Sequence, residues 1–117
     1  MKIILKGNPI SNNSIYKRGK GKSFYMTDKA EALKNDYAWQ AVVQVGNKEL
    51  LSGKLEVKIK LYFEDKRKHD IDNYGKLLLD SISGIVYDDD SQIIKMQVEK
   101  FHDRENPRIE IELKELK

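Results

Sequence analysis

The most regular alternation of hydrophobic and polar residues in the chain lies between residues 55 and 63. Every second residue there is apolar, namely Leu55, Val57, Ile59, Leu61 and Phe63. Because side chains of a strand point alternately to opposite faces, this period of two predicts a strand with one buried and one solvated face. Shorter patterns predict further strands at residues 3–5, 23–26, 92–101 and 108–114, with a turn at 103–107 between the last two.

Two segments instead place their apolar residues at helical spacing. The first runs from residue 28 to residue 45, and Thr27 before it is a good N-cap, while Gly46 after it favours a stop. Trp39 falls off the apolar stripe of this helix, so we expect it beside a groove or a partner surface. The second helix is predicted from about Asp72 to Ser83, with Leu77, Leu78 and Ile82 facing inward.

These elements, together with a polar, glycine-rich loop at 11–22, predict one domain over residues 1–117. The predicted class is α+β, a mixed β-sheet of four to five strands with two helices packed on one face. The chain has no cysteine, which excludes disulfides and thiolate metal sites and fits a reducing, cytoplasmic setting. Its apolar runs are too short for a signal peptide or for the roughly 18 residues of a membrane span.

Charge is distributed unevenly along the chain, although the net value of +3 is mild. Seven of the ten aspartates lie between Asp65 and Asp90, whereas the segment 11–25 holds no acid. The candidate DNA-binding basic residues are Lys17, Arg18, Lys20 and Lys22 of that segment, with Lys66, Arg67 and Lys68 further on. We interpret the basic residues as neutralising phosphates and the acidic cluster as binding a cation.

Asp70 and Asp72 are spaced i, i+2 at the predicted boundary between a strand and a helix. In extended backbone such residues point to the same side, so their carboxylates can converge, and a hard divalent cation such as Mg²⁺ relieves their repulsion. Lys76 follows Asp72 by one helical turn. It either forms a surface ion-pair ladder with Asp72 and Asp80, or it contacts a phosphate beside the metal.

Asp88, Asp89 and Asp90 form a second acidic group in a predicted turn. Three adjacent acids are usually a solvated loop, and they reach the first pair only if folding returns the turn to it. Calcium loops starting at Asp70 or at Asp88 each lack one required residue, so EF-hands are excluded. A cation held by three carboxylates would activate water for phosphodiester hydrolysis without histidine or cysteine.

Two stretches of this acidic region match a known pattern. Residues 69–76 read His-Asp-Ile-Asp-Asn-Tyr-Gly-Lys, and residues 84–93 read Gly-Ile-Val-Tyr-Asp-Asp-Asp-Ser-Gln-Ile. They resemble the RusA family of Holliday junction resolvases, whose pattern is Asp-x-Asp-Asn, a lysine on the following helix, and later Asp-Asp-[Ser/Ala]-Gln. The segment Gly7-Asn8-Pro9 and the basic residues after it also resemble the start of that family.

The resemblance implies a homodimeric endonuclease that depends on Mg²⁺, with Mn²⁺ as an alternative, and resolves four-way DNA junctions in recombination and repair. By that match, Asp70, Asp72 and Asp90 hold the metal, Lys76 assists catalysis, and Asn73 lies on the DNA side. Asp88 is an extra acid relative to the pattern. The resemblance also implies a bacterial or prophage-encoded protein. A two-fold dimer suits this substrate independently, because a four-way junction is two-fold symmetric and needs two symmetric cuts.

Two other hypotheses remain at this stage. The chain is alternatively a non-enzymatic nucleic-acid-binding module with a structural ion site, which predicts salt-dependent binding without cleavage. The third hypothesis is a metal-stabilised interaction domain that binds no nucleic acid. The dense aspartates argue against the second hypothesis, and the acid-free basic loop argues against the third.

Overall fold

The computed structural model describes residues 1–117 with the exception of residues 12–15, 19–23, 27 and 117. Its elements, in chain order, are β1 (Lys2–Lys6), β2 (Tyr16–Arg18), β3 (Phe24–Met26), α1 (Asp28–Val45), β4 (Leu55–Phe63), η2 (Ile71–Asn73), α2 (Lys76–Ile82), η3 (Asp90–Gln92), β5 (Ile93–His102) and β6 (Arg108–Glu115). The predicted strands and the predicted first helix are confirmed. The proposed cap Thr27 lies outside the described residues.

Four strands form one mixed sheet in the order β1-β6-β4-β5, and β2 and β3 form a separate hairpin. The strand β6 runs antiparallel to both β1 and β4, whereas β4 and β5 are parallel. The α+β class and the mixed sheet are therefore confirmed. The prediction that the last two strands pair through a turn is wrong, because β4 lies between β5 and β6. Parallel pairing of β4 and β5 instead requires a crossover, which residues 64–92 supply.

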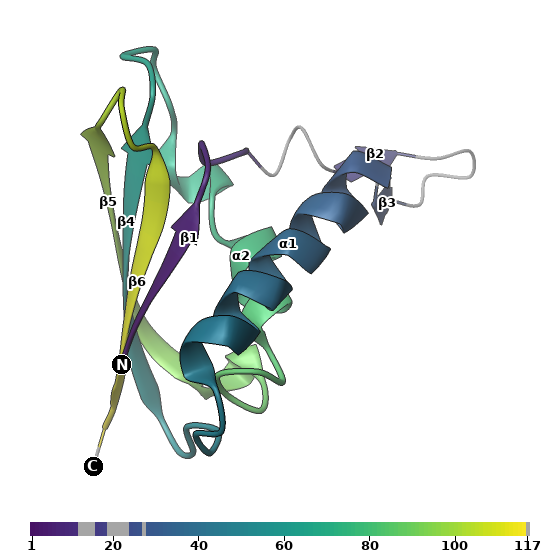
Figure 1. Ribbon diagram of the computed structural model, residues 1–117, viewed down its shortest axis with the longest axis vertical. Helices are drawn as coiled ribbons and strands as arrows, with labels where there is room; N and C mark the ends of the chain where they lie inside the picture. Colours follow the sequence, from purple (N-terminus) through teal and green to yellow (C-terminus); the bar gives the residue numbers. More distant parts are fainter. Residues whose placement is uncertain (12–15, 19–23, 27, 117) are drawn as a thin grey trace.

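The core lies between one face of this sheet and the two α-helices. In Figure 1, α1 and α2 lie on the same side of the sheet, and β2 and β3 lie at the start of α1. The sheet contributes its alternate, buried residues Ile3, Leu5, Leu55, Val57, Ile59, Leu61, Phe63, Ile109, Ile111 and Leu113. The helices contribute Tyr37, Ala41 and Val45 from α1 and Leu78 and Ile82 from α2. The inward-facing residues predicted for the second helix are thus buried.

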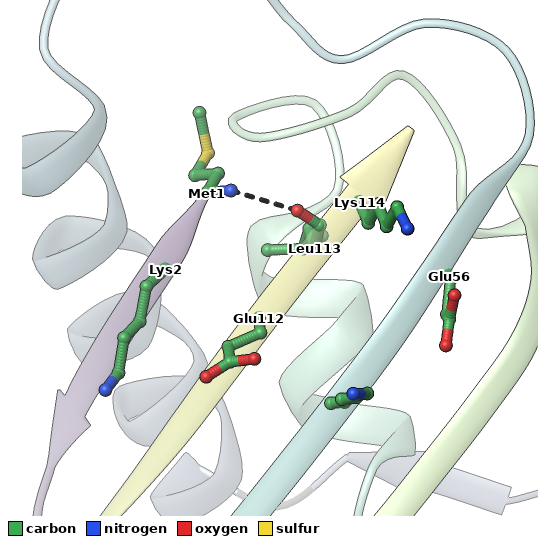
Figure 2. Close-up of a pocket in the computed structure, with 7 residues that line it drawn as sticks. Met1, Lys2, Glu56, Glu112, Leu113 and Lys114 are labelled. Carbon is green, nitrogen blue, oxygen red and sulfur yellow. Dashed lines mark hydrogen bonds between the residues drawn. The ribbon is translucent and has the colours of Figure 1, made fainter. Parts of the chain in front are cut away.

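The other face of the sheet is open and charged. A hollow of about 440 Å³ on this face is lined by charged side chains of both signs from β1, β6 and β4, which Figure 2 draws as sticks. Glu110 is the most buried carboxylate of this face and accepts hydrogen bonds from Lys2 at 3.1 Å and Arg108 at 2.7 Å. Opposite charges face each other across β4 and β6, in the pairs Glu56–Lys114, Lys58–Glu112 and Lys60–Glu110, as expected for a solvated sheet face.

Candidate active site

The first acidic pair lies at a 3₁₀ turn and not at the start of a long helix. Asp70 has an extended backbone and precedes η2, whereas Asp72 is inside η2. The second helix begins only at Lys76, because Gly75 takes φ 147° and interrupts the helical path. The predicted helix start at Asp72 is therefore wrong, and so is the extended geometry assumed for this pair. Both carboxylates are exposed.

His69 anchors the segment that carries Asp70. Its ring stacks on Phe63, with centroids 3.9 Å apart and planes 5° from parallel. Its Nε2 lies 2.8 Å from Asp65 Oδ1, and its Nδ1 lies 3.1 Å from the Tyr74 hydroxyl. The side chain of His69 is only 18% exposed. The hydrogen bond from His69 holds the pKa of Asp65 below its usual value.

The same segment is tied to the far end of β5. The ammonium of Lys100 donates a 2.9 Å hydrogen bond to the backbone oxygen of His69, and η2 packs against β5. Burial raises the pKa of Tyr74, and the nearby charges of Asp65 and Asp70 raise it further. Asp70 is therefore close to Tyr74, at the end of the sheet where β4 and β5 finish.

In the second acidic group, Asp89 has a structural role. Asp89 caps η3: its carboxylate accepts hydrogen bonds from the backbone N–H and the hydroxyl of Ser91, and its own N–H donates to Gln92 Oε1 at 2.9 Å. These bonds to Ser91 hold the pKa of Asp89 below its usual value. The amide of Gln92 also donates to the backbone oxygens of Leu51 and Gly53. All three acids of this group are exposed, but the carboxylate of Asp89 is engaged in the cap that it forms with Gln92.

The two acidic groups lie toward opposite ends of the parallel strands. Phe63 at the end of β4 pairs with His102, while Ile93 at the start of β5 pairs with Leu55. Asp90 comes just before Ile93, whereas the Asp70 segment is bound to Lys100. From Ile93 to Lys100 the strand covers about 23 Å, at 3.3 Å per residue.

A single chain consequently does not assemble the predicted metal site. Among the described residues, no group of three or more histidine, aspartate or glutamate side chains is placed to hold a metal ion. Asp70, Asp72 and Asp90 therefore do not meet within one copy of the chain. The charge of Asp90 acts on Tyr87 instead: burial raises the pKa of Tyr87, and Asp90, Asp80 and Asp89 raise it further.

The basic residues predicted to hold DNA lie beside the Asp70 segment. Lys66, Arg67 and Lys68 are exposed and line a hollow of about 380 Å³ that Lys100 and His102 of β5 also line. Basic side chains from two segments therefore line one concavity next to the first acidic pair, together with Asp65. A concave cationic surface of this kind suits a phosphate backbone.

The other predicted DNA-binding residues are spread over three elements. Lys17 and Arg18 belong to β2, while Lys20 and Lys22 lie outside the described residues. Asn73 ends η2 and is half-buried, and Lys76 begins α2 with an exposed side chain. Lys76 begins α2 after the interruption at Gly75, so Asp72 and Lys76 do not lie on one continuous helix.

Comparison with known proteins gives the family. The model of the endodeoxyribonuclease RusA family matches residues 6–114 of the chain. The chain belongs to the RusA endodeoxyribonuclease family. A match of 41% identity over 49 residues also links it to an uncharacterized Bacillus subtilis (strain 168) protein, YqaN. That match covers 42% of the chain and 34% of YqaN, so the shared segment spans about a third of the longer protein.

Membership of the RusA family confirms the resemblance drawn from the two acidic stretches, since both lie inside the matched range. No helix in the described part of this RusA-family chain has the length and hydropathy needed to cross a membrane. Sequence reasoning missed the roles of His69 and of Gln92. The stacking of His69 depends on a tertiary contact with β4, whereas Ser91-Gln92 after Asp89 is a capping sequence that was readable in advance.

Proposed function

We propose that this chain is an Mg²⁺-dependent endodeoxyribonuclease that resolves four-way DNA junctions by two symmetric phosphodiester hydrolyses. The observation that carries the proposal is the family match over residues 6–114, which includes every candidate site residue from 17 to 90. Binding of branched DNA, the metal requirement and the homodimer belong to the same proposal.

Asp70, Asp72 and Asp90 are the proposed metal ligands, because carboxylate oxygens are what Mg²⁺ prefers. A cation held there supplies the polarisation that hydrolysis needs in the absence of a histidine or cysteine nucleophile. Asp89 is not assigned to the metal, since its carboxylate already caps η3. Lys76, exposed at the start of α2, is assigned to the scissile phosphate.

The separation of the acids within one chain makes the homodimer part of the site. Because Asp90 and the Asp70 segment lie toward opposite ends of β5, a metal site that uses all three needs Asp70 and Asp72 from one copy and Asp90 from its partner. Such sharing also yields two equivalent sites related by the two-fold axis, as symmetric cleavage requires.

The first test incubates a labelled four-way junction with the protein and Mg²⁺. We expect cleavage to disappear in Asp70→Asn and Asp72→Asn while junction binding survives, and to disappear in wild type after removal of the metal with EDTA. Asp28→Asn, an exposed acid at the start of α1, is the matched control and should cut normally. Normal cleavage by both site variants would show that the assignment is wrong.

The second test mixes Asp70→Asn chains with Asp90→Asn chains. If the acids are shared between copies, each mixed dimer has one site without either acid and one intact site, so the mixture should nick junctions that neither variant cuts alone. If all ligands came from one copy, every site in the mixture would lack one acid and would be inactive. An inactive mixture would therefore contradict the shared site without contradicting the nuclease.

The absence of a three-carboxylate group in the described part of one chain favours one alternative, a non-enzymatic DNA-binding module. That alternative predicts junction binding that weakens steeply with salt and no cleavage in Mg²⁺ or Mn²⁺. Cleavage by wild type that Asp72→Asn abolishes excludes it.

A further inference from the structure

The two edge strands of the sheet, β1 and β5, differ in whether another element covers them. Along β1, Gln44 Oε1 accepts a 2.8 Å hydrogen bond from the N–H of Ile4, and Gln40 Oε1 accepts one of 2.8 Å from the N–H of Lys6. Their amide nitrogens donate to the backbone oxygens of the same two residues. Four residues along a helix and two along a strand cover similar lengths, about 6 Å and 6.6 Å. Helix α1 thus covers this edge.

The edge formed by β5 has no comparable cover among the described residues. It is the last strand in the order β1-β6-β4-β5 and is ten residues long. Its helix-side positions are Met96 and Val98, which share a face with the buried residues Val57 and Ile59 of β4. Met96 is 50% exposed and Ile94 58% exposed, so the apolar layer of the core continues to an open edge. The unpaired N–H and C=O groups of such an edge are a template for pairing with another chain.

The sequence of β5 is complementary to itself about Gln97. In an antiparallel pair of two copies centred on Gln97, residues whose numbers sum to 194 face each other. Lys95 then faces Glu99 of the second copy, twice by symmetry, and Met96 faces Val98 twice. Lys95, Gln97 and Glu99 all lie on the open face with Glu56, Lys58 and Lys60 of β4. Opposite charges thus meet on the wet face, and apolar residues meet on the helix side.

We propose that two copies of this chain join along β5, antiparallel and centred on Gln97, as one continuous eight-stranded sheet. This inference rests on the proposed homodimer and specifies the interface between its two copies, which we call the seam. The antiparallel arrangement sets the start of β5, with Asp90 just before it, beside the end of the other copy's β5. The η2 turn with Asp72 packs against β5, and the Asp70 segment is bound to Lys100. The same seam therefore brings together the acids that one chain separates.

The test uses charge reversal and sedimentation equilibrium. Lys95→Glu and Glu99→Lys each place like charges opposite each other in both pairs, which is expected to raise the dimer dissociation constant about tenfold at low salt. The doubly exchanged Lys95→Glu, Glu99→Lys chain restores both pairs and should dimerise within about threefold of wild type. An equimolar mixture of the two single variants should form heterodimers, which shows that each variant is folded.

A cross-link supplies a second, independent measurement. The chain has no cysteine, so Gln97→Cys introduces one thiol per copy on the proposed axis. Oxidation should give covalent dimers, because facing residues of antiparallel strands have Cβ atoms close enough for a disulfide. Lys58→Cys is the matched control: it pairs with Gln97 on the same face, but in a central strand, and should remain uncross-linked.

The results of these experiments distinguish a wrong seam from a wrong homodimer. Dimers of undiminished affinity in both single variants, without Gln97 cross-linking, would overturn the seam while leaving the homodimer intact. A wild-type chain that stays monomeric at all concentrations and on junction DNA would overturn the homodimer on which this inference rests.

Discussion

The hydroxyl of Tyr87 donates a 2.7 Å hydrogen bond to the backbone oxygen of Leu79, in the last turn of α2. The ring of Tyr87 is fully buried, so this bond connects the end of α2 to the turn that carries the second acidic group. The same oxygen also accepts a 3.2 Å hydrogen bond from the N–H of Ser83, so the tyrosine adds a second donor to a carbonyl at the end of the helix.

Tyr87→Phe should therefore lower the free energy of unfolding by about 1 kcal/mol, the usual net value of a buried hydrogen bond. The measurement is urea denaturation followed by circular dichroism. Tyr37→Phe is the matched control, because Tyr37 is also buried but the structure shows no hydrogen bond for its hydroxyl among the described residues. Removal of the Tyr37 hydroxyl is expected to change the free energy of unfolding by less than about 0.5 kcal/mol. Equal losses in the two variants would contradict the role given to the Tyr87 bond.

Gly75 separates η2 from α2 and has φ 147° with ψ −39°, a conformation that side chains with a Cβ rarely adopt. Gly75→Asn should cost about 1–3 kcal/mol of stability. Gly53 has φ 73°, in the left-handed region that asparagine tolerates, so Gly53→Asn should cost about 1 kcal/mol or less. Thermal unfolding of the two variants checks the order. A smaller loss of stability at Gly75 than at Gly53 would show that the interruption between η2 and α2 does not require a glycine at position 75.

The elements with a strong period were predictable from the sequence, and their neighbours in space were not. The alternation from Leu55 to Phe63 defines β4 because each buried residue is bracketed by polar ones. The same kind of pattern found β5 and β6, but strand pairing depends on contacts far apart in sequence. A turn at 103–107 between two strands favours a hairpin, yet β4 takes the place between them.

At the candidate site, residue types were predictable and their placement was not. Leu77, Leu78 and Ile82 continue a helical spacing that extends back through Asp72, and nothing in that pattern reveals the φ of Gly75. Among three equivalent acids, Asp89 differs from Asp90 only through the cap that it forms on η3. Whether a turn returns to a distant pair is decided by the direction of the crossover, which periodicity does not encode.

His69 holds the Asp70 segment through one stacked ring and two polar contacts. His69→Phe keeps a ring on Phe63 but loses the contacts with Asp65 and Tyr74. We expect His69→Phe to be more stable than His69→Ala, by about 1 kcal/mol of stacking and burial, and to bind junctions normally. Under the proposed function, both variants should cut more slowly, because Asp70 is less firmly placed. Full cleavage by His69→Phe in single-turnover assays would remove His69 from that positioning role.

Glu110 makes the open face of the sheet sensitive to acid. Burial alone would raise the pKa of this carboxyl, but the hydrogen bonds from Arg108 and Lys2 outweigh burial and hold it below its ordinary value of 4.5. A carboxyl whose pKa is lower in the folded state stabilises the fold fully above 4.5 and loses that contribution as the pH falls through its native pKa. Arg108 also donates a hydrogen bond of 2.8 Å to Asp103 and lowers the pKa of that carboxyl. The contributions of Glu110 and Asp103 to stability are therefore both lost as the pH falls.

The free energy of unfolding should consequently fall as the pH is lowered from about 5 toward 3. Glu110→Gln should be less stable than wild type at pH 7 and should show a shallower fall, because a neutral amide has no charge to lose. Glu112→Gln, two residues along the same strand, is the control: Glu112 is exposed, the structure shows no ion pair for it among the described residues, and its variant should follow the wild-type curve. Urea denaturation at half-unit pH steps makes the comparison. A fall in Glu110→Gln as steep as in wild type would assign the acid sensitivity to other carboxyls.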